Sequence, residues 1–134
     1  MSDDVSINLE LSLSIERSIQ AELLLLLGQK PSHGYELIQR LNDAPFMSSE
    51  VDTATIYRNL RRMDKDGLIK SHWEVSESGP GRRQYQLTSQ GEATLKLWVQ
   101  YLAQQKARLE NFLQAYRDYD VSLAKGENGG NNLE

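Results

Sequence analysis

The first part of the chain changes its period of hydrophobic and polar residues. Over 5–15 the two kinds alternate, a pattern typical of a strand or an extended arm, although Leu, Ser and Glu also tolerate a helix. The apolar positions then recur at helical spacing between a candidate N-cap at Ser14 and a stop at Gly28. We therefore expect an N-terminal arm over 1–13 and a helix over 14–27, unless the alternating stretch is the early start of that helix.

A short helical pattern follows this first helix. Tyr35, Ile38 and Leu41 share one face of a helix expected over 32–42, and Pro45 lies just beyond its end. The chain then carries a second short pattern of the same kind.

This next helix is expected to begin at a cap, either Asp52 or Thr53, and to end at Gly67. Its inward positions are Ile56, Leu60 and Met63. Two short helices joined by a turn thus follow the first helix.

The residues after Gly67 alternate in the manner of a β-hairpin. Residues 68–75 and 83–87 form the two alternating runs, and turn-forming residues fill 77–81, so the pair predicts a hairpin with a loop longer than two residues. The positions able to face one another are Ile69, Trp73 and Val75 on the first strand and Tyr85 and Leu87 on the second.

The last third predicts one long helix. Ser89 and Glu92 have the spacing of a capping box, and no proline interrupts the following residues to about Leu123. Apolar residues recur at alternating steps of three and four, a heptad pattern interrupted once by Gln105. Such a helix is about 50 Å long and exceeds what so small a domain can cover. We therefore expect 89–124 to be a dimerisation helix, followed by a disordered tail over 125–134. The expected dimer-interface residues are Leu95, Trp98, Leu102, Leu109, Phe112, Tyr116, Tyr119 and Leu123.

Composition restricts the class of protein. The chain has 134 residues, 39% apolar and 25% charged, which suits one globular domain. Without Cys, and with two histidines far apart, it offers neither a disulfide framework nor a metal motif, and we expect no metal and no cofactor. No apolar run approaches a membrane span and the acidic N-terminus is not a signal peptide, so a soluble cytoplasmic protein is expected.

Charge is distributed unevenly. The net charge of −4 and the pI near 5.2 argue against a nucleic-acid binder. Residues 54–96, however, hold eight Lys or Arg against five Asp or Glu, a local net charge of +3, so the remainder carries −7. This cationic segment is either a face that binds a polyanion or an ordinary solvated surface.

The order of elements favours the first interpretation. Helix, helix, turn, helix and hairpin over 14–88 is the order of a winged helix-turn-helix domain, in which the third helix enters the DNA major groove. The fold class is therefore mainly α with a small β-hairpin and a long C-terminal helix. The candidate DNA-binding residues of the third helix are Thr53, Thr55, Tyr57, Arg58, Arg61, Arg62 and Lys65. Arginine binds guanine edges or phosphates through its planar fork, whereas a solvated face would pair these cations with Asp64 or Asp66.

Four further residues complete the candidate interface. Arg82 and Arg83 stand beside the Gly-Pro-Gly turn of the hairpin, where they can reach a phosphate or a minor groove. His33 and Tyr35 lie at the start of the second helix, which favours a nearby phosphate, although Tyr35 also suits the core. The hydroxyl of Tyr57 can bind a phosphate while its ring packs.

At these positions the chain resembles the PadR-like transcriptional regulators. The resemblance covers about 21–98 and includes Pro-Ser-His-Gly-Tyr-Glu-Leu over 31–37, Thr-Ile-Tyr-Arg-Asn-Leu over 55–60 and Asp-Gly-Leu-Ile over 66–69. It continues with Gly-Pro-Gly-Arg-Arg-Gln-Tyr-Gln-Leu-Thr over 79–88. The chain departs from the family at Arg58, where many members carry proline.

The resemblance implies a homodimeric winged-helix repressor of the smaller branch with one C-terminal helix. Its partners would be a near-palindromic double-stranded DNA operator and a second copy of the chain. Some members of the family bind planar aromatic effectors, for which Trp98 and Tyr101 are candidate stacking residues, although Trp98 equally suits an interface core.

Three function classes compete for this sequence. The leading hypothesis is a sequence-specific DNA-binding regulator, and the alternative is a protein-interaction module that does not touch DNA. An enzyme is not expected, because neither a nucleophile elbow nor a phosphate-binding Gly loop nor a metal-ligand cluster is present in the sequence.

Overall fold

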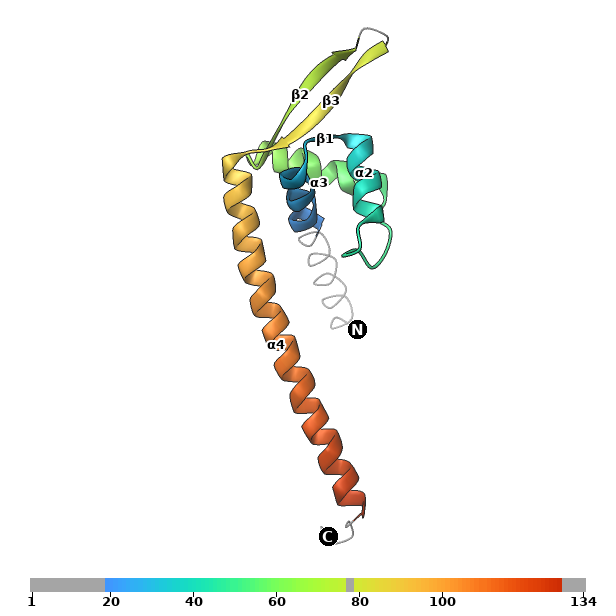
Figure 1. Ribbon diagram of the computed structural model, residues 1–134, viewed down its shortest axis with the longest axis vertical. Coiled ribbons are helices and arrows are strands. Elements are labelled where there is room, and N and C mark those ends of the chain that lie inside the picture. Colours follow the sequence, from blue (N-terminus) through green and yellow to red (C-terminus); the bar gives the residue numbers. More distant parts are fainter. Residues whose placement is uncertain (1–18, 77–78, 129–134) are drawn as a thin grey trace, which may run out of the picture. The chain divides into compact units, whose positions relative to one another are not determined.

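The computed structural model describes residues 19–76 and 79–128. They form two compact units, the first ending at Trp98 and the second beginning at Val99. The fold is mainly helical with a small antiparallel sheet, as the sequence predicts (Figure 1). The N-terminal arm expected over 1–13 and the predicted start of the first helix at residue 14 lie outside the described residues. The elements in chain order are a helix over 19–29, β1 Ser32–His33, α2 Gly34–Asp43, α3 Thr53–Lys65, β2 Ile69–Ser76, β3 Gly79–Leu87 and α4 Ser89–Asn128.

The first unit has one hydrophobic core, to which three helices and the base of the sheet contribute. Its centre is fully buried: Leu23, Leu24, Leu37, Leu41, Ile56, Leu60 and Met63. The three inward positions predicted for α3 are thus confirmed. The first helix runs past Gly28 and ends at residue 29 rather than at the predicted residue 27, so the predicted end is wrong by two residues.

Helix α2 begins two residues later than predicted, because the chain pairs with the sheet first. Ser32 lies opposite Tyr85 and His33 opposite Gln84, so β1 becomes the third strand in the order β1-β3-β2. The exposed edge of β3 offers backbone groups that this short segment satisfies. The buried positions of α2 are Gly34, Leu37 and Leu41 rather than the predicted Tyr35, Ile38 and Leu41.

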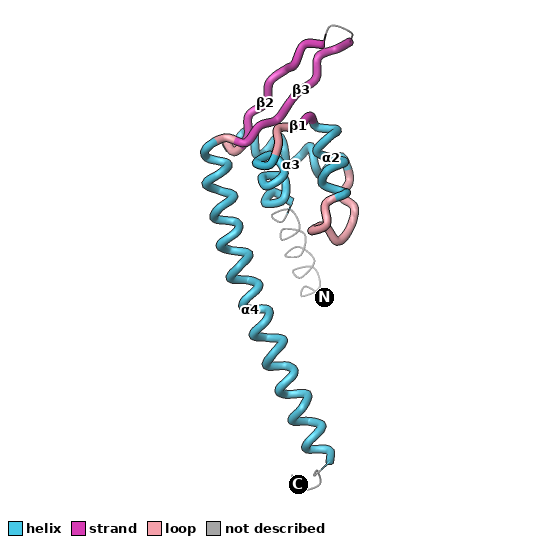
Figure 2. Tube along the Cα trace, in the orientation of Figure 1, coloured by secondary structure: helices cyan, strands magenta, loops and turns pink. Residues whose placement is uncertain are grey.

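The β2–β3 hairpin extends beyond the helical core (Figure 2). Ile69 pairs with Leu87 at its base, as the alternation suggests. At its far end Ser76 pairs with Gly79, so only residues 77–78 separate the strands and the predicted longer loop over 77–81 is wrong. An irregularity in register near Ser76 accommodates the Gly-Pro-Gly segment within β3.

The start of α4 is fixed by Thr88 rather than by the predicted Ser89. The Thr88 hydroxyl accepts from the Gly91 backbone N–H at 3.0 Å and lies 2.7 Å from the Gly67 carbonyl oxygen, to which it donates. Thr88 is therefore the N-cap, and it joins the end of the hairpin to the turn that follows α3. Gly67 adopts a φ of 78°, which favours glycine at the C-terminal end of a helix.

The second unit consists of α4 from Val99 onward. The helix continues to Asn128, so the tail predicted from residue 125 begins at least four residues too early. Its heptad positions are exposed within the single chain, namely Leu102, Leu109, Phe112, Tyr116, Tyr119 and Leu123. An apolar stripe of this length that the described residues of its own chain leave exposed is typical of a helix that packs on another helix.

Candidate nucleic-acid interface

Helix α3 presents a cationic face opposite its buried stripe. Asp52 caps the helix, its Oδ1 accepting from the Thr55 backbone N–H at 2.9 Å, and hydrogen bonds from Thr55 lower the pKa of its carboxyl. Because Ile56 and its partners point inward, Arg58, Arg61, Arg62 and Lys65 are all exposed on the remaining surface. Thr53 is exposed beside them and Thr55 is half-buried.

The alternative in which the cations of α3 pair with Asp64 or Asp66 is not observed for Arg61, Arg62 and Lys65. Across the residues that the structure describes, Arg61, Arg62 and Lys65 form no ion pair with a carboxylate. Asp64 instead accepts a hydrogen bond from Ser71 of β2 at 3.4 Å. This bond ties the C-terminal half of α3 to the hairpin and leaves Arg61 and Arg62 available to an external anion.

Tyr57 has a packing role. It is half-buried against the core, and its hydroxyl lies so close to Gly34 that a Cβ at that position would come within 2.6 Å of it. The glycine therefore lets α2 and α3 approach each other. A phosphate contact by the same hydroxyl, as the sequence suggests, remains a prediction.

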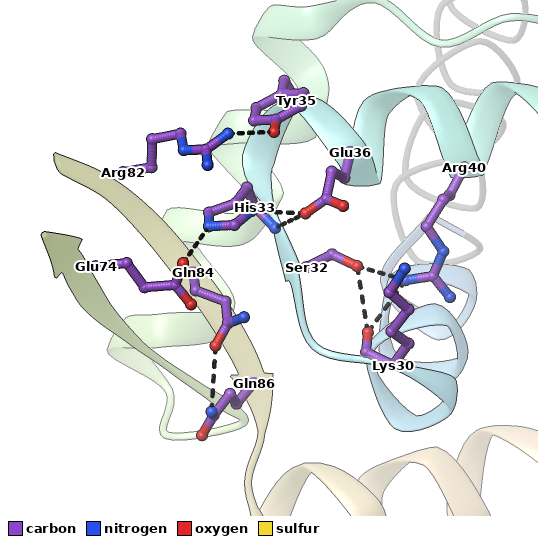
Figure 3. A network of polar contacts seen from close by, with 10 residues as sticks. All are labelled: Lys30, Ser32, His33, Tyr35, Glu36, Arg40, Glu74, Arg82, Gln84 and Gln86. Carbon is purple, nitrogen blue, oxygen red and sulfur yellow. Dashed lines mark hydrogen bonds and ion pairs between the residues drawn. The ribbon is translucent and has the colours of Figure 1, made fainter. Parts of the chain in front are cut away.

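The hairpin brings Arg82 to α2 (Figure 3). One guanidinium nitrogen of Arg82 donates to the Tyr35 hydroxyl at 2.6 Å, and its central carbon lies 5.8 Å from the centroid of the Tyr35 ring. Tyr35 is 52% exposed, so the prediction that it belongs to the core is wrong. It lies on the side of α2 that borders the hairpin.

Arg83 projects from the hairpin with an aromatic partner that the sequence analysis did not assign to the site. Its guanidinium carbon lies 5.3 Å from the centroid of the Trp73 ring, directly across the two strands. Trp73 is 62% exposed and Val75 is more exposed still, so the apolar alternation of β2 continues beyond the core. An aromatic residue paired across strands with arginine was the available signal.

His33 joins α2 to the hairpin through two carboxylates. Its Nδ1 lies 2.7 Å from Glu36 Oε1 and its Nε2 lies 2.9 Å from Glu74 Oε2. Hydrogen bonds to Glu36 and then Glu74 raise the pKa of the His33 imidazole above its ordinary value of 6.5. The His33 backbone N–H and side chain in turn lower the pKa of Glu36. His33 thus fixes the position of the hairpin, and its predicted DNA contact remains a prediction.

The first residues of α4 pack within their own unit. Leu95 and Trp98 lie against the core of the winged-helix unit, and the Trp98 indole N–H donates to Gln20 Oε1 at 2.9 Å. Their predicted places in a dimer interface, and that of Trp98 in an effector site with Tyr101, remain predictions. No helix in the described ranges 19–76 and 79–128 is both long and apolar enough to cross a membrane.

This geometry defines a winged helix-turn-helix protein: a cationic third helix followed by a hairpin that carries arginines. The family model described as "Transcriptional regulator PadR-like family" matches residues 23–97, more than half of the chain. The chain therefore belongs to the PadR-like family of transcriptional regulators.

Solved structures agree with this assignment. A PadR-like transcription factor from Bacteroides fragilis is 27% identical, covers 78% of this chain and 98% of its own, and superposes with a TM-score of 0.67. A PadR-like regulator from Bacillus cereus is 32% identical over 71% of this chain and 90% of its own, with a TM-score of 0.61. An uncharacterized protein of Lysinibacillus sphaericus is 27% identical over 75% of this chain and 92% of its own.

Proposed function

We propose that this PadR-family regulator binds a near-palindromic DNA operator as a homodimer and represses transcription. In this arrangement α3 enters the major groove, and Arg82 and Arg83 reach the flanking backbone or minor groove. Two copies would contact half-sites about one helical turn apart, roughly 34–36 Å. Repression further requires that the operator overlap the promoter.

The observation that carries the proposal is the set of cations on α3. Arg61, Arg62 and Lys65 are exposed and without a carboxylate partner in the described parts of the chain, although the protein as a whole is acidic. An anionic ligand with regularly spaced charges compensates such a face, and DNA is the anion that an α-helix of this kind fits.

The homodimer is supported by α4. Its apolar heptad positions from Leu102 to Leu123 are exposed in the single chain, and a second copy would cover them in a self-complementary way. Tyr116 and Tyr119 lie with their ring centroids 6.2 Å apart and can interdigitate with the partner helix.

The test is a mobility-shift titration on DNA from upstream of the protein's own gene, at two salt concentrations and with an unrelated competitor. We expect a specific complex with two protomers per site, whose affinity falls steeply with salt because phosphate contacts release counterions. The double variant Arg62→Ala and Arg82→Ala should lower affinity at least about tenfold.

The matched control is the double variant Arg117→Ala and Lys125→Ala, which removes the same charge from α4 and should leave affinity within about twofold. Binding that barely responds to salt, or equal losses in both double variants, would refute the proposed interface. No complex on any DNA would favour the protein-interaction module instead.

An aromatic effector is proposed as a secondary ligand of the same protein. Tyr101 is 48% exposed, whereas Trp98 has its indole N–H engaged by Gln20. Quenching of Trp fluorescence by planar aromatic compounds, compared between the wild type and Trp98→Phe, tests this proposal; unchanged quenching in the variant would contradict it.

A further inference from the structure

His33 occupies a position that favours its charged form. Both ring nitrogens lie within hydrogen-bond distance of carboxylate oxygens, Nδ1 at 2.7 Å from Glu36 and Nε2 at 2.9 Å from Glu74. Ionised carboxylates only accept hydrogen bonds, so the ring can donate to both of them only as an imidazolium. A neutral imidazole has one N–H and can satisfy one of the two carboxylates. The His33 side chain is only 12% exposed, which limits the access of water that could compete for these two contacts.

The Glu74 carboxylate has a second cation within reach. Glu74 and Arg82 are directly opposed across β2 and β3, so their side chains leave the same face of the hairpin a short distance apart. In the structure Glu74 binds His33 while Arg82 donates to the Tyr35 hydroxyl at 2.6 Å (Figure 3). The imidazolium therefore holds the carboxylate that would otherwise pair with the wing arginine.

We propose that His33 is a proton-dependent positioning residue for the wing: as imidazolium it retains Glu74 and leaves Arg82 to a DNA phosphate, and as neutral imidazole it releases Glu74 to neutralise Arg82. The proposal names a regulation of the DNA-binding site and rests on the function proposed above. The protein then loses one phosphate contact per wing when His33 loses its proton, and DNA affinity falls as pH rises.

The direction of the pH response follows from the same contacts. The pKa of His33 is raised above 6.5. The ion pairs of the His33 imidazolium with Glu36 and Glu74 are therefore fully present below that value and are lost as pH rises through the raised pKa. The ion pairs contribute to folding stability in the same window and with the same sign.

Charged and titratable groups on every neighbouring element enter this balance. Glu36 faces the ring from α2 and Glu74 from β2. Lys30, just before β1, lowers the pKa of Glu36 and so helps to keep that carboxylate ionised. On β3 the charged group is Arg82. His72 of β2 shares a cross-strand row with Gln84 and His33.

The experiment measures operator affinity of the full-length protein at about pH 6 and about pH 9, each at several salt concentrations. Four proteins are compared: the wild type, His33→Gln, Glu74→Gln and His72→Gln. His72→Gln is the matched control, because His72 is the other histidine of the chain and lies exposed on β2, the strand that carries Glu74.

The wild type should lose affinity about tenfold between the two pH values, and its slope of log affinity against log salt should fall by about one per wing. His33→Gln should bind weakly at both pH values, because neutral glutamine leaves Glu74 free. Glu74→Gln should bind tightly at both, because no carboxylate remains to neutralise Arg82. His72→Gln should keep the pH response of the wild type.

Relative to the wild type, His33→Gln should weaken binding at about pH 6 and Glu74→Gln should strengthen it at about pH 9, and a general loss of structure cannot produce both changes. Weakened binding in both variants, or an unchanged pH response in His33→Gln, would overturn the proposal. Loss of the pH response in His72→Gln would show that His72 rather than His33 produces the response and would overturn the proposal.

A readout without DNA separates this proposal from the function on which it rests. NMR titration should give the His33 imidazole a pKa above 6.5, and Glu74→Gln should lower that pKa. If the protein does not bind DNA but His33 titrates in this way, the proposed function is refuted and the proton-dependent contact of His33 with Glu74 is retained. If the protein binds DNA but the pKa of His33 is not raised, the proposed role of His33 is refuted.

Discussion

The winged-helix unit and α4 use the same apolar periodicity with opposite results. Leu60 in α3 and Leu109 in α4 both occupy repeating apolar positions, yet Leu60 is fully buried and Leu109 is 56% exposed. In the first unit the helices and the hairpin return to cover one another within one chain. From Val99 onward the second unit is a single helix whose apolar stripe meets no other element of its own unit.

The difference separates stability within a chain from stability between chains. Burial of a leucine contributes roughly 1.5–3 kcal/mol, and in the first unit folding alone realises this free energy. An isolated helix gains little from its own hydrogen bonds in water, so we expect the exposed stripe of α4 to gain its stability from association. The first unit should therefore unfold independently of protein concentration, and α4 should not.

The largest expected effect contrasts the two leucines directly. Leu60→Ala leaves a cavity in a closed core and should lower the free energy of unfolding of the first unit by about 2–5 kcal/mol at every protein concentration. Leu109→Ala should leave that transition unchanged at low concentration and lower the melting temperature only where dimers form. Urea and thermal unfolding at two concentrations check both variants, and equal losses would contradict the contrast.

A charge in the exposed stripe should break the second region alone. Phe112→Glu places a carboxylate at a heptad position that is 69% exposed in the single chain, and burial of that charge between two helices is strongly unfavourable. We expect a monomer in sedimentation equilibrium and operator affinity lower by about 100-fold, because the two half-sites are no longer linked. The far-UV circular dichroism spectrum and the unfolding transition of the first unit should stay unchanged. A persistent dimer would place the interface elsewhere.

A glycine pair tests how tightly the first unit closes. A Cβ at Gly91 would collide with the Leu68 carbonyl oxygen, a backbone atom, whereas at Gly79 it would meet nothing within 4 Å. Gly91→Ala should therefore lower the free energy of unfolding by about 1–3 kcal/mol. Gly79→Ala should change it by less than about 0.5 kcal/mol. Thermal unfolding distinguishes the two, and a harmless Gly91→Ala would contradict the close approach of α4 to the hairpin base.

Patterns of period 3.6 proved the most reliable part of the sequence. The inward stripe of α3, its cap at Asp52 and its cationic outer face all follow from residue types at fixed spacing within one element. Predictions failed where another element intervened. Tyr35 lies on an apolar row of α2, yet the hairpin arginine Arg82 and the neighbouring His33 provide its partners at the surface.

The same distinction explains the ends of elements. Thr88 rather than Ser89 caps α4, because its hydroxyl also reaches carbonyls of the turn after α3, which local spacing cannot indicate. The two residues of β1 became a strand since β3 offered an edge beside them. Long-range hydrogen bonds, which depend on how the chain returns to itself, decided both boundaries.

By itself, the sequence determined the order of elements, the cationic helix, the apolar repeat of α4 and the motifs that place the chain in its family. These features depend on periodicity and side-chain chemistry within a few turns of the chain. Only the tertiary structure decided that His33 bridges Glu36 and Glu74, because Glu74 lies 41 positions from His33 along the chain. Such a contact arises when β2 and β3 fold beside α2, and no local pattern records which charges that packing brings together.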